Sequence, residues 1–295
     1  MGTMLTVIIG VASAVVYGSA DFLGGLASKR IAVVRATAIA SGSGLVLLLL
    51  LYPLIGGAWS GSAVVFGLLS GSCGAVALAL LYACLAIGPM SILSPLTAVV
   101  SAIVPMTVGL LRGERFGALG YLALGLALVA VVLVGFVPEK GAVRPSLAGL
   151  LMAIGSGAAI GLFLVLIDLT PDDSGLVPLI MNRSVSTVVM LGAAGVLALV
   201  ALARRRGDPA VARDARGWMP GLWFAVGCGL LDATANAGLL LGLRLGDLSV
   251  VSVLTALYPA GTIILAAIVL KERIAPLQYA GLALAIGAAA LLALT

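Results

Sequence analysis

Residues 88–133 read GPMSILSPLTAVVSAIVPMTVGLLRGERFGALGYLALGLALVAVVL, and residues 246–291 read GDLSVVSVLTALYPAGTIILAAIVLKERIAPLQYAGLALAIGAAAL. With a shift of 158, the two segments share 16 identities in 46 positions, against about 5 expected by chance in a chain so rich in Ala and Leu. The shared polar residues carry most of the information. Ser91, Ser94 and Thr97 align with Ser249, Ser252 and Thr255, Glu114-Arg115 aligns with Glu272-Arg273, and Tyr121 aligns with Tyr279. A duplicated and almost wholly apolar chain is typical of secondary transporters, which bind their substrate between the two halves.

Composition supports a membrane protein. Of 295 residues, 62% are hydrophobic and 9% are charged, whereas a soluble protein is about a quarter charged. Most of the chain must therefore face lipid or other apolar helices. The net charge is +5, and the basic residues lie in short connections between apolar runs, as is usual for membrane loops. No nucleic-acid-binding motif accompanies them, so we expect no nucleic-acid partner.

The residue types needed for several kinds of catalysis are missing. The chain has no histidine, which excludes Ser/His and Cys/His catalysis and imidazole proton relays. Cys73, Cys84 and Cys228 lie inside apolar runs at spacings that match no metal site. The sequence therefore predicts no catalytic residues, no metal site and no cofactor.

Ten apolar runs are long enough to span a bilayer, which takes about 20 residues. The sequence predicts an all-α polytopic membrane protein with transmembrane helices at 4–26, 33–55, 62–86, 91–111, 116–137, 147–168, 177–202, 218–243, 248–270 and 275–294. Residues 1–137 form one five-helix repeat, residues 138–146 a linker, and residues 147–295 the second repeat. Because five is an odd number, the second half must enter the membrane upside down, which gives two inverted repeats.

The orientation of the termini follows from the distribution of Lys and Arg. Twelve of the 16 lie at connections after odd-numbered helices. The remaining four, after even-numbered helices, are Arg112, Arg115, Arg183 and Arg244. The positive-inside rule therefore places both termini outside the cell.

Asp232 and Asn236 are the strongest candidates for the substrate site. Only Asp21 and Asp232, of eleven acidic residues, lie well within predicted spans. A carboxylate there costs about 3 kcal/mol on insertion scales, so it is usually neutralised, paired or hydrated. Asn236 lies one turn beyond Asp232 on the same face of the helix. This polar patch predicts substrate binding near the middle of the bilayer, and a structural hydrogen-bonded pair is the alternative.

Asp21 and Tyr17 form a second polar patch, near the end of the first predicted helix. Asp21 is about two turns from Lys29-Arg30, so it either lines a cavity or forms a structural pair at the interface. Tyr17 lies on the same face, where it either contacts substrate or packs as a core aromatic. Both residues are included in the predicted site.

Hydroxyl side chains recur every three or four residues on the fourth and ninth predicted helices. Ser94, Thr97, Ser252 and Thr255 belong to these stripes, which either line an aqueous path or form a seam of small residues between helices. Tyr258-Pro259 interrupts the ninth helix and Pro105 interrupts the fourth, because proline frees a backbone carbonyl. We expect Ser94, Thr97, Ser252, Thr255, Tyr258 and Pro259 to lie near the substrate.

Glycine and charged residues suggest three further features. Gly67-xxx-Gly71 and Gly157-xxx-Gly161 predict close helix contacts. Arg183, near the start of the seventh predicted helix, either binds a substrate carboxylate or reaches toward lipid headgroups, as does its counterpart Arg35. The Gly113-Glu114-Arg115 and Lys271-Glu272-Arg273 turns predict interfacial ion pairs.

With these motifs the chain resembles the EamA-like ten-helix members of the drug/metabolite transporter superfamily. The resemblance rests on Tyr17-Gly18, on an arginine opening the second helix of each half, and on the duplicated acidic turn followed by a tyrosine. It covers nearly the whole chain. The chain departs from the family pattern where Tyr17 replaces a tryptophan and Ser101 replaces a proline, and it lacks a basic loop between the second and third helices.

The resemblance implies a multi-pass carrier of the inner (cytoplasmic) membrane that moves small metabolites, often exporting amino acids or related amphiphiles. It implies helices 1, 3, 4, 6, 8 and 9 around a central cavity. It also implies that both termini lie inside the cell, in conflict with the charge count. We expect alternating access, a small-molecule substrate and lipid contacts. Asp232 is the candidate for proton exchange, because burial favours a neutral carboxyl, and proton-linked antiport and facilitated diffusion both remain open. Two alternatives remain open: a membrane enzyme acting on a lipid-linked substrate, for which only Asp172-Asp173 is available, and a non-transporting scaffold.

Overall fold

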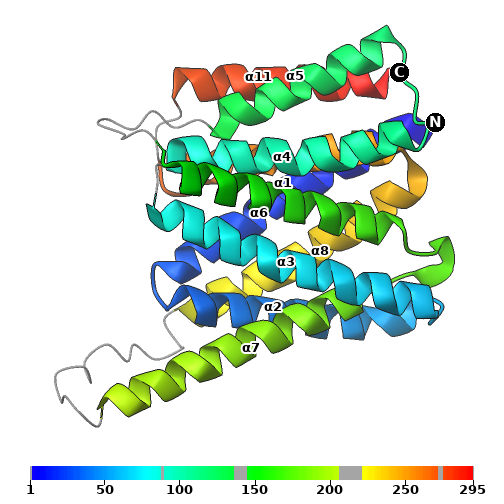
Figure 1. Ribbon diagram of the computed structural model, residues 1–295. Helices are drawn as coiled ribbons and strands as arrows, with labels where there is room; N and C mark the ends of the chain where they lie inside the picture. Colours follow the sequence, from blue (N-terminus) through cyan, green and yellow to red (C-terminus); the bar gives the residue numbers. More distant parts are fainter. Residues whose placement is uncertain (1, 88–89, 136–144, 206–220, 272–274, 295) are drawn as a thin grey trace.

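The protein is a bundle of helices that run the length of the molecule, with no strand in the described residues (Figure 1). This computed structural model describes residues 2–87, 90–135, 145–205, 221–271 and 275–294. Eleven α-helices lie in that part of the chain: α1 (Gly2–Ser28), α2 (Val33–Ile55), α3 (Gly61–Ile87), α4 (Met90–Leu111), α5 (Ala118–Gly135), α6 (Leu147–Asp168), α7 (Val177–Arg205), α8 (Leu222–Leu245), α9 (Leu248–Thr255), α10 (Tyr258–Val269) and α11 (Pro276–Ala293). A short 3-10 turn, η1 (Asp172–Ser174), precedes α7.

Most predicted spans are confirmed as helices. Nine segments of the described chain are long and apolar enough to cross a membrane, and α4 adds the shorter apolar stretch Leu96–Leu111. The all-α, multi-pass character predicted from composition is therefore confirmed. The predictions for 33–55 and 147–168 match α2 and α6 at both ends.

The predicted helix at 248–270 is divided, with Ala256 and Leu257 lying between α9 and α10. Pro259 explains the division, because it has no N–H to donate to the carbonyl of Thr255. The Leu257 N–H instead bonds the Leu254 carbonyl at 3.1 Å. The expected interruption at Pro105 is wrong, since α4 continues through that residue.

Helix packing places two helix pairs at opposite edges of the bundle. α5 packs against α11 at one edge, and α2 against α7 at the other (Figure 1). Between these edges, α1 packs on α8 and α10, while α3 and α4 both pack on α6. Both termini lie at the same end of the bundle (Figure 1). The connections α2–α3, α4–α5, α6–α7 and α8–α9 share that end, which we call the terminal end.

Glycine residues allow the central helices to pack so closely that their backbones are in contact. A Cβ added to Gly18 of α1 would lie 2.6 Å from the Thr262 nitrogen and 2.7 Å from the Gly261 Cα, both in α10. Thr262 Oγ1 also donates a 3.1 Å hydrogen bond to the Gly18 carbonyl. Such crossings need residues without side chains. The Tyr17-Gly18 motif therefore has a packing role, because it fixes α1 against α10.

The predicted glycine contacts are confirmed as well. A Cβ on Gly71 of α3 would lie 2.7 Å from the Asn182 carbonyl of α7, and one on Gly157 of α6 would lie 2.6 Å from the Thr97 carbonyl of α4. These small residues let polar groups on neighbouring helices meet. Asn182 Nδ2, for example, donates to Ser70 Oγ at 3.0 Å.

Candidate functional site

An ion pair between α7 and α8 lies at the centre of the candidate site. The Arg183 guanidinium contacts the Asp232 carboxylate, and their side chains are 16% and 25% exposed. Arg183 follows the start of α7 by six residues, which is about 9 Å along a helix. Asp232 lies near the middle of α8. The costly carboxylate within the span is therefore compensated by a charge from a neighbouring helix.

Asn236 and Tyr17 extend this polar centre. Asn236 is buried, and its Nδ2 donates a 2.8 Å hydrogen bond to the backbone carbonyl of Asp232. Tyr17 of α1 lines the same cavity as Asn236. α1, α7 and α8 thus converge on one group of polar side chains.

Two cavities meet at the Arg183–Asp232 pair. The smaller one, of about 190 Å³, is lined by polar residues that include Tyr17, Asn182 and Asn236. The larger one has a volume of about 680 Å³. Arg183, Ser186 and Asp232 line both cavities, so the ion pair lies where they adjoin.

The larger cavity extends toward the end of the bundle opposite the termini. Its lining includes Ser28 at the end of α1, Val33 at the start of α2 and Gly135 at the end of α5. Asp21 lines it from α1 with an exposed side chain. The polar groups therefore lie at the inner part of a space that opens toward one end of the molecule.

The structure brings most predicted site residues to these cavities. Asp21, Thr97, Asp232, Tyr258 and Pro259 line the larger cavity. Tyr17 and Asn236 line the smaller cavity, and Asp232 lines both cavities. The break between α9 and α10 accounts for Tyr258 and Pro259, because it starts a new helix at the cavity wall.

The described hydroxyl groups of the two stripes mainly form hydrogen bonds to helix backbones. Thr97 Oγ1 donates to the carbonyls of Leu93 at 3.0 Å and Ala153 at 3.2 Å. Ser252 Oγ donates to the Ser249 carbonyl at 3.0 Å. Thr255 Oγ1 is buried without a hydrogen-bond partner in the described residues. Neither Ser252 nor Thr255 lines the two cavities described above, and the side chain of Ser94 lies outside the described residues.

Arg183 is the charged residue of the cavity lining that the sequence does not place in the predicted site. Its position near a helix start predicts contact with a lipid headgroup or a substrate carboxylate. A signal was nevertheless present: a carboxylate in the middle of a span calls for a cationic partner. Among the predicted spans, only 33–55 and 177–202 contain Lys or Arg beyond their first residue, and Arg183 is the deeper of the two.

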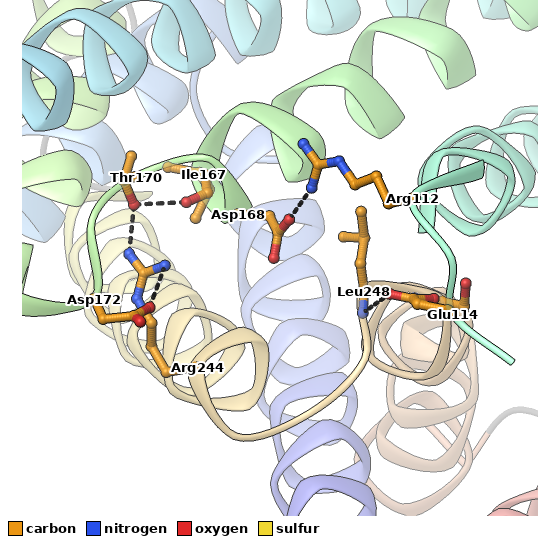
Figure 2. A network of polar contacts seen from close by, with 9 residues as sticks. Arg112, Glu114, Ile167, Asp168, Thr170, Asp172, Arg244 and Leu248 are labelled. Carbon is orange, nitrogen blue, oxygen red and sulfur yellow. Dashed lines mark hydrogen bonds and ion pairs between the residues drawn. The ribbon is translucent and has the colours of Figure 1, made fainter. Parts of the chain in front are cut away.

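Arginine clusters connect the helices at the terminal end (Figure 2). Arg112, after α4, pairs with Asp168 of α6 at 2.5 Å. Arg244 of α8 donates to Thr170 Oγ1 at 2.5 Å and to the Pro171 carbonyl at 3.1 Å. It also pairs with Asp172 at 3.5 Å. Together these bonds tie the ends of α4, α6 and α8 to one another.

Glu114 joins the two halves at the same end. Its carboxylate accepts a hydrogen bond from the backbone N–H group of Leu248 at 2.8 Å (Figure 2) and another from that of Ser249 at 3.2 Å. These are first-turn donors of α9, where a negative charge is favourable. The predicted local ion pair in the Gly113–Arg115 turn is therefore wrong for Glu114, which caps a distant helix. The equivalent Glu272-Arg273 lies outside the described residues.

Comparison with known proteins gives two positive findings. The model of the EamA-like transporter family matches residues 147–294, about half of the chain. Among 29 matching chains of solved structures, one described as the crystal structure of a protein is 17% identical, with a TM-score of 0.69. That match covers 97% of this chain and 95% of the other, and at such identity it shows a common fold alone. No curated protein matches the chain.

Proposed function

Because the chain belongs to the EamA-like transporter family, whose members are secondary transporters, we propose that it exports a small metabolite, an amino acid or a related amphiphile, across the cytoplasmic membrane. The observation that carries this proposal is the cavity of about 680 Å³ with the Arg183–Asp232 pair at its inner part. Charged residues within membrane spans typically mark substrate or ion pathways. Asp232 and Asn236 are the proposed polar anchors for the substrate.

The helix contacts support the proposed inverted repeat. Exchanging the halves replaces α1 by α6, α2 by α7, α3 by α8, α4 by the α9–α10 pair, and α5 by α11. The α1–α8 contact then becomes α6–α3, and the α2–α8 contact becomes α7–α3. All four of these contacts occur. α5–α11 and α2–α7 are each their own counterpart, as expected for helices that meet on a twofold axis.

Alternating access would proceed by opening one end of the bundle while closing the other. The cavity extends toward the end opposite the termini, whereas Arg112, Arg244 and Glu114 tie helices together at the terminal end. In the proposed cycle these bonds break when the cavity changes sides, and one group of helices rocks against the other around the fixed site.

Proton coupling at Asp232 is part of the proposal. A carboxyl paired with Arg183 can take up a proton when the pair separates, which would link transport to a pH gradient. The test compares wild type and Asp232→Asn in liposomes with an imposed pH gradient, and Asp247→Asn, an exposed acid at the start of α9, is the control. Unchanged dependence on the gradient in Asp232→Asn would remove the proton role.

Transport itself is tested in two stages. A resistance screen of an overexpressing strain identifies metabolites, and counterflow with the purified chain in liposomes then measures their movement. Counterflow that is lost in Arg183→Gln but retained in the exposed-site variant Arg115→Gln would support the central cavity as the route. If no metabolite shows counterflow and cysteines placed at Thr97 and Asp232 are unreactive to hydrophilic reagents, the chain is a scaffold and the transport proposal fails.

A further inference from the structure

The charges that line the larger cavity do not balance. Among its described lining residues, Asp21, Asp232 and Arg183 are the charged ones. Arg183 pairs with Asp232, so that pair is close to neutral. Asp21 is left as a second carboxylate in the same space.

Asp21 has no hydrogen bond or ion pair within the described chain, and its side chain is exposed to the cavity. Asp232 lines the same cavity and has a charge of the same sign, which is unfavourable for a second carboxylate there. The basic Arg30, nine residues later, lies over the Phe224 ring at 4.4 Å. Among the described residues, therefore, no Lys or Arg side chain pairs with the Asp21 carboxylate.

We propose that this cavity selects organic cations, with Asp21 as the residue that receives the protonated amine or guanidinium of the substrate. This inference rests on the transport function proposed above and narrows its substrate from amino acids and related amphiphiles to amines without a carboxylate, with Asp21 in place of Asp232 as the group that holds the substrate charge. A single positive charge would neutralise Asp21 and leave the Arg183–Asp232 pair intact. A zwitterion would add a carboxylate for which Arg183 is already occupied, and an anion would add a second unpaired negative charge.

The rest of the wall suits an apolar body attached to that cation. Leu78, Leu81, Met190, Ile263 and Pro259 line the cavity. Burial of hydrocarbon against such side chains supplies binding free energy, while the charged group fixes orientation. The expected substrate is thus an amine with one hydrophobic or aromatic portion and no free carboxylate.

A native thiol allows the sign of the cavity potential to be measured. Cys228 lines the cavity and is partly exposed. In the full chain with Cys73→Ser and Cys84→Ala, Cys228 is the one remaining thiol. Its reaction rates with a trimethylammonium-bearing and a sulfonate-bearing methanethiosulfonate are compared with the rates of a small thiol in solution. Taking the ratio of the two rates cancels any change in thiolate fraction.

The cationic reagent should be favoured by about tenfold relative to the free thiol, because a cleft of one charge concentrates counter-ions. Asp21→Asn should remove most of that preference, and the exposed-site variant Asp247→Asn should leave it unchanged. Equal rates, or a preference for the sulfonate, would overturn the cation inference while leaving a hydrated cavity. Cys228 that is inert to both reagents would instead count against the transport proposal.

A second arm tests the ligand class with three compounds of one shape. Phenethylamine, phenylalanine and 3-phenylpropionate carry a cation, a zwitterion and an anion on the same aromatic body. Phenethylamine should slow labelling of Cys228 at the lowest concentration, and this protection should weaken about tenfold or more in Asp21→Asn. Stronger protection by phenylalanine would assign the cavity to zwitterions, and stronger protection by 3-phenylpropionate would assign it to anions. Either result would overturn the inference.

Discussion

The Arg183 guanidinium of α7 and the Asp232 carboxylate of α8 form an ion pair where two cavities adjoin. The pair joins a helix of the bundle edge to a central helix, and it is accessible from the larger cavity. Its charges can therefore contribute both to stability and to substrate recognition. The two contributions are separable by experiment.

Removing one member of the pair should destabilise the protein more than removing both. Arg183→Met or Asp232→Leu alone leaves an uncompensated charge within a span, and we expect each to lower the free energy of unfolding by about 3 kcal/mol. The double variant should recover part of that loss but none of the transport. Unfolding in detergent and counterflow in liposomes provide the two readouts. Full additivity of the single losses would show that the pair has no energetic coupling.

Glu114 should stabilise the start of α9 from the opposite half. Glu114→Gln keeps the size of the side chain but removes the negative charge of the group that accepts hydrogen bonds from the Leu248 and Ser249 N–H groups. We expect a loss of about 1 kcal/mol, measured as a lower unfolding temperature. Arg115→Gln, in the same turn and exposed, is the control. Equal stability of the two variants would contradict the capping role.

Breaking the terminal-end contacts should expose residues that are buried beneath them. In a chain without its native cysteines, Ile167→Cys introduces a thiol where the native side chain is 0% exposed. Adding Arg112→Ala and Arg244→Ala should raise its labelling rate with a membrane-impermeant reagent by about tenfold, since both ties that hold α6 are then lost. Asp173→Asn, an exposed substitution in η1, should leave labelling slow. Fast labelling before the arginines are removed would mean that they do not close this end.

Two glycines of α1 should differ sharply in their response to a methyl group. Gly18→Ala places a Cβ 2.6 Å from a backbone nitrogen of α10, whereas Gly25→Ala meets nothing within 4 Å. We expect Gly18→Ala to cost about 1–3 kcal/mol. Gly25→Ala should be neutral or stabilising, because Ala favours a helix by up to about 1 kcal/mol over Gly. Thermal unfolding of both variants measures the difference, and similar values would show that α1 and α10 can separate without loss.

Hydropathy and the internal duplication predicted the helices well, because a span needs a long apolar run and polar residues then mark its ends. They also predicted Asp21 and Asp232 as cavity residues, since a carboxylate within a span must be hydrated or paired. The partner of Asp232 depends on how α7 and α8 rotate against each other, which hydropathy does not encode. For the same reason spacing alone predicts Ser252 as a site residue, although its hydroxyl bonds the helix backbone and it lines neither cavity.

Glu114 shows the limit of local reasoning. The turn after α4 predicts a bond to a sequence neighbour, yet the carboxylate reaches a helix more than a hundred residues away. Only the packing of the two halves brings these groups together. Its alignment with Glu272 was a signal of importance but gave no indication of the partner.

The break at Ala256 and Leu257 divides the ninth span into two helices, α9 and α10. Glu114 binds the first turn of α9 at the terminal end, and Thr262 of α10 donates a hydrogen bond to the Gly18 carbonyl of α1. Tyr258 is the first residue of α10 and lines the larger cavity. A tilt of α10 can thus change the shape of the cavity wall while the bond between Glu114 and α9 remains in place.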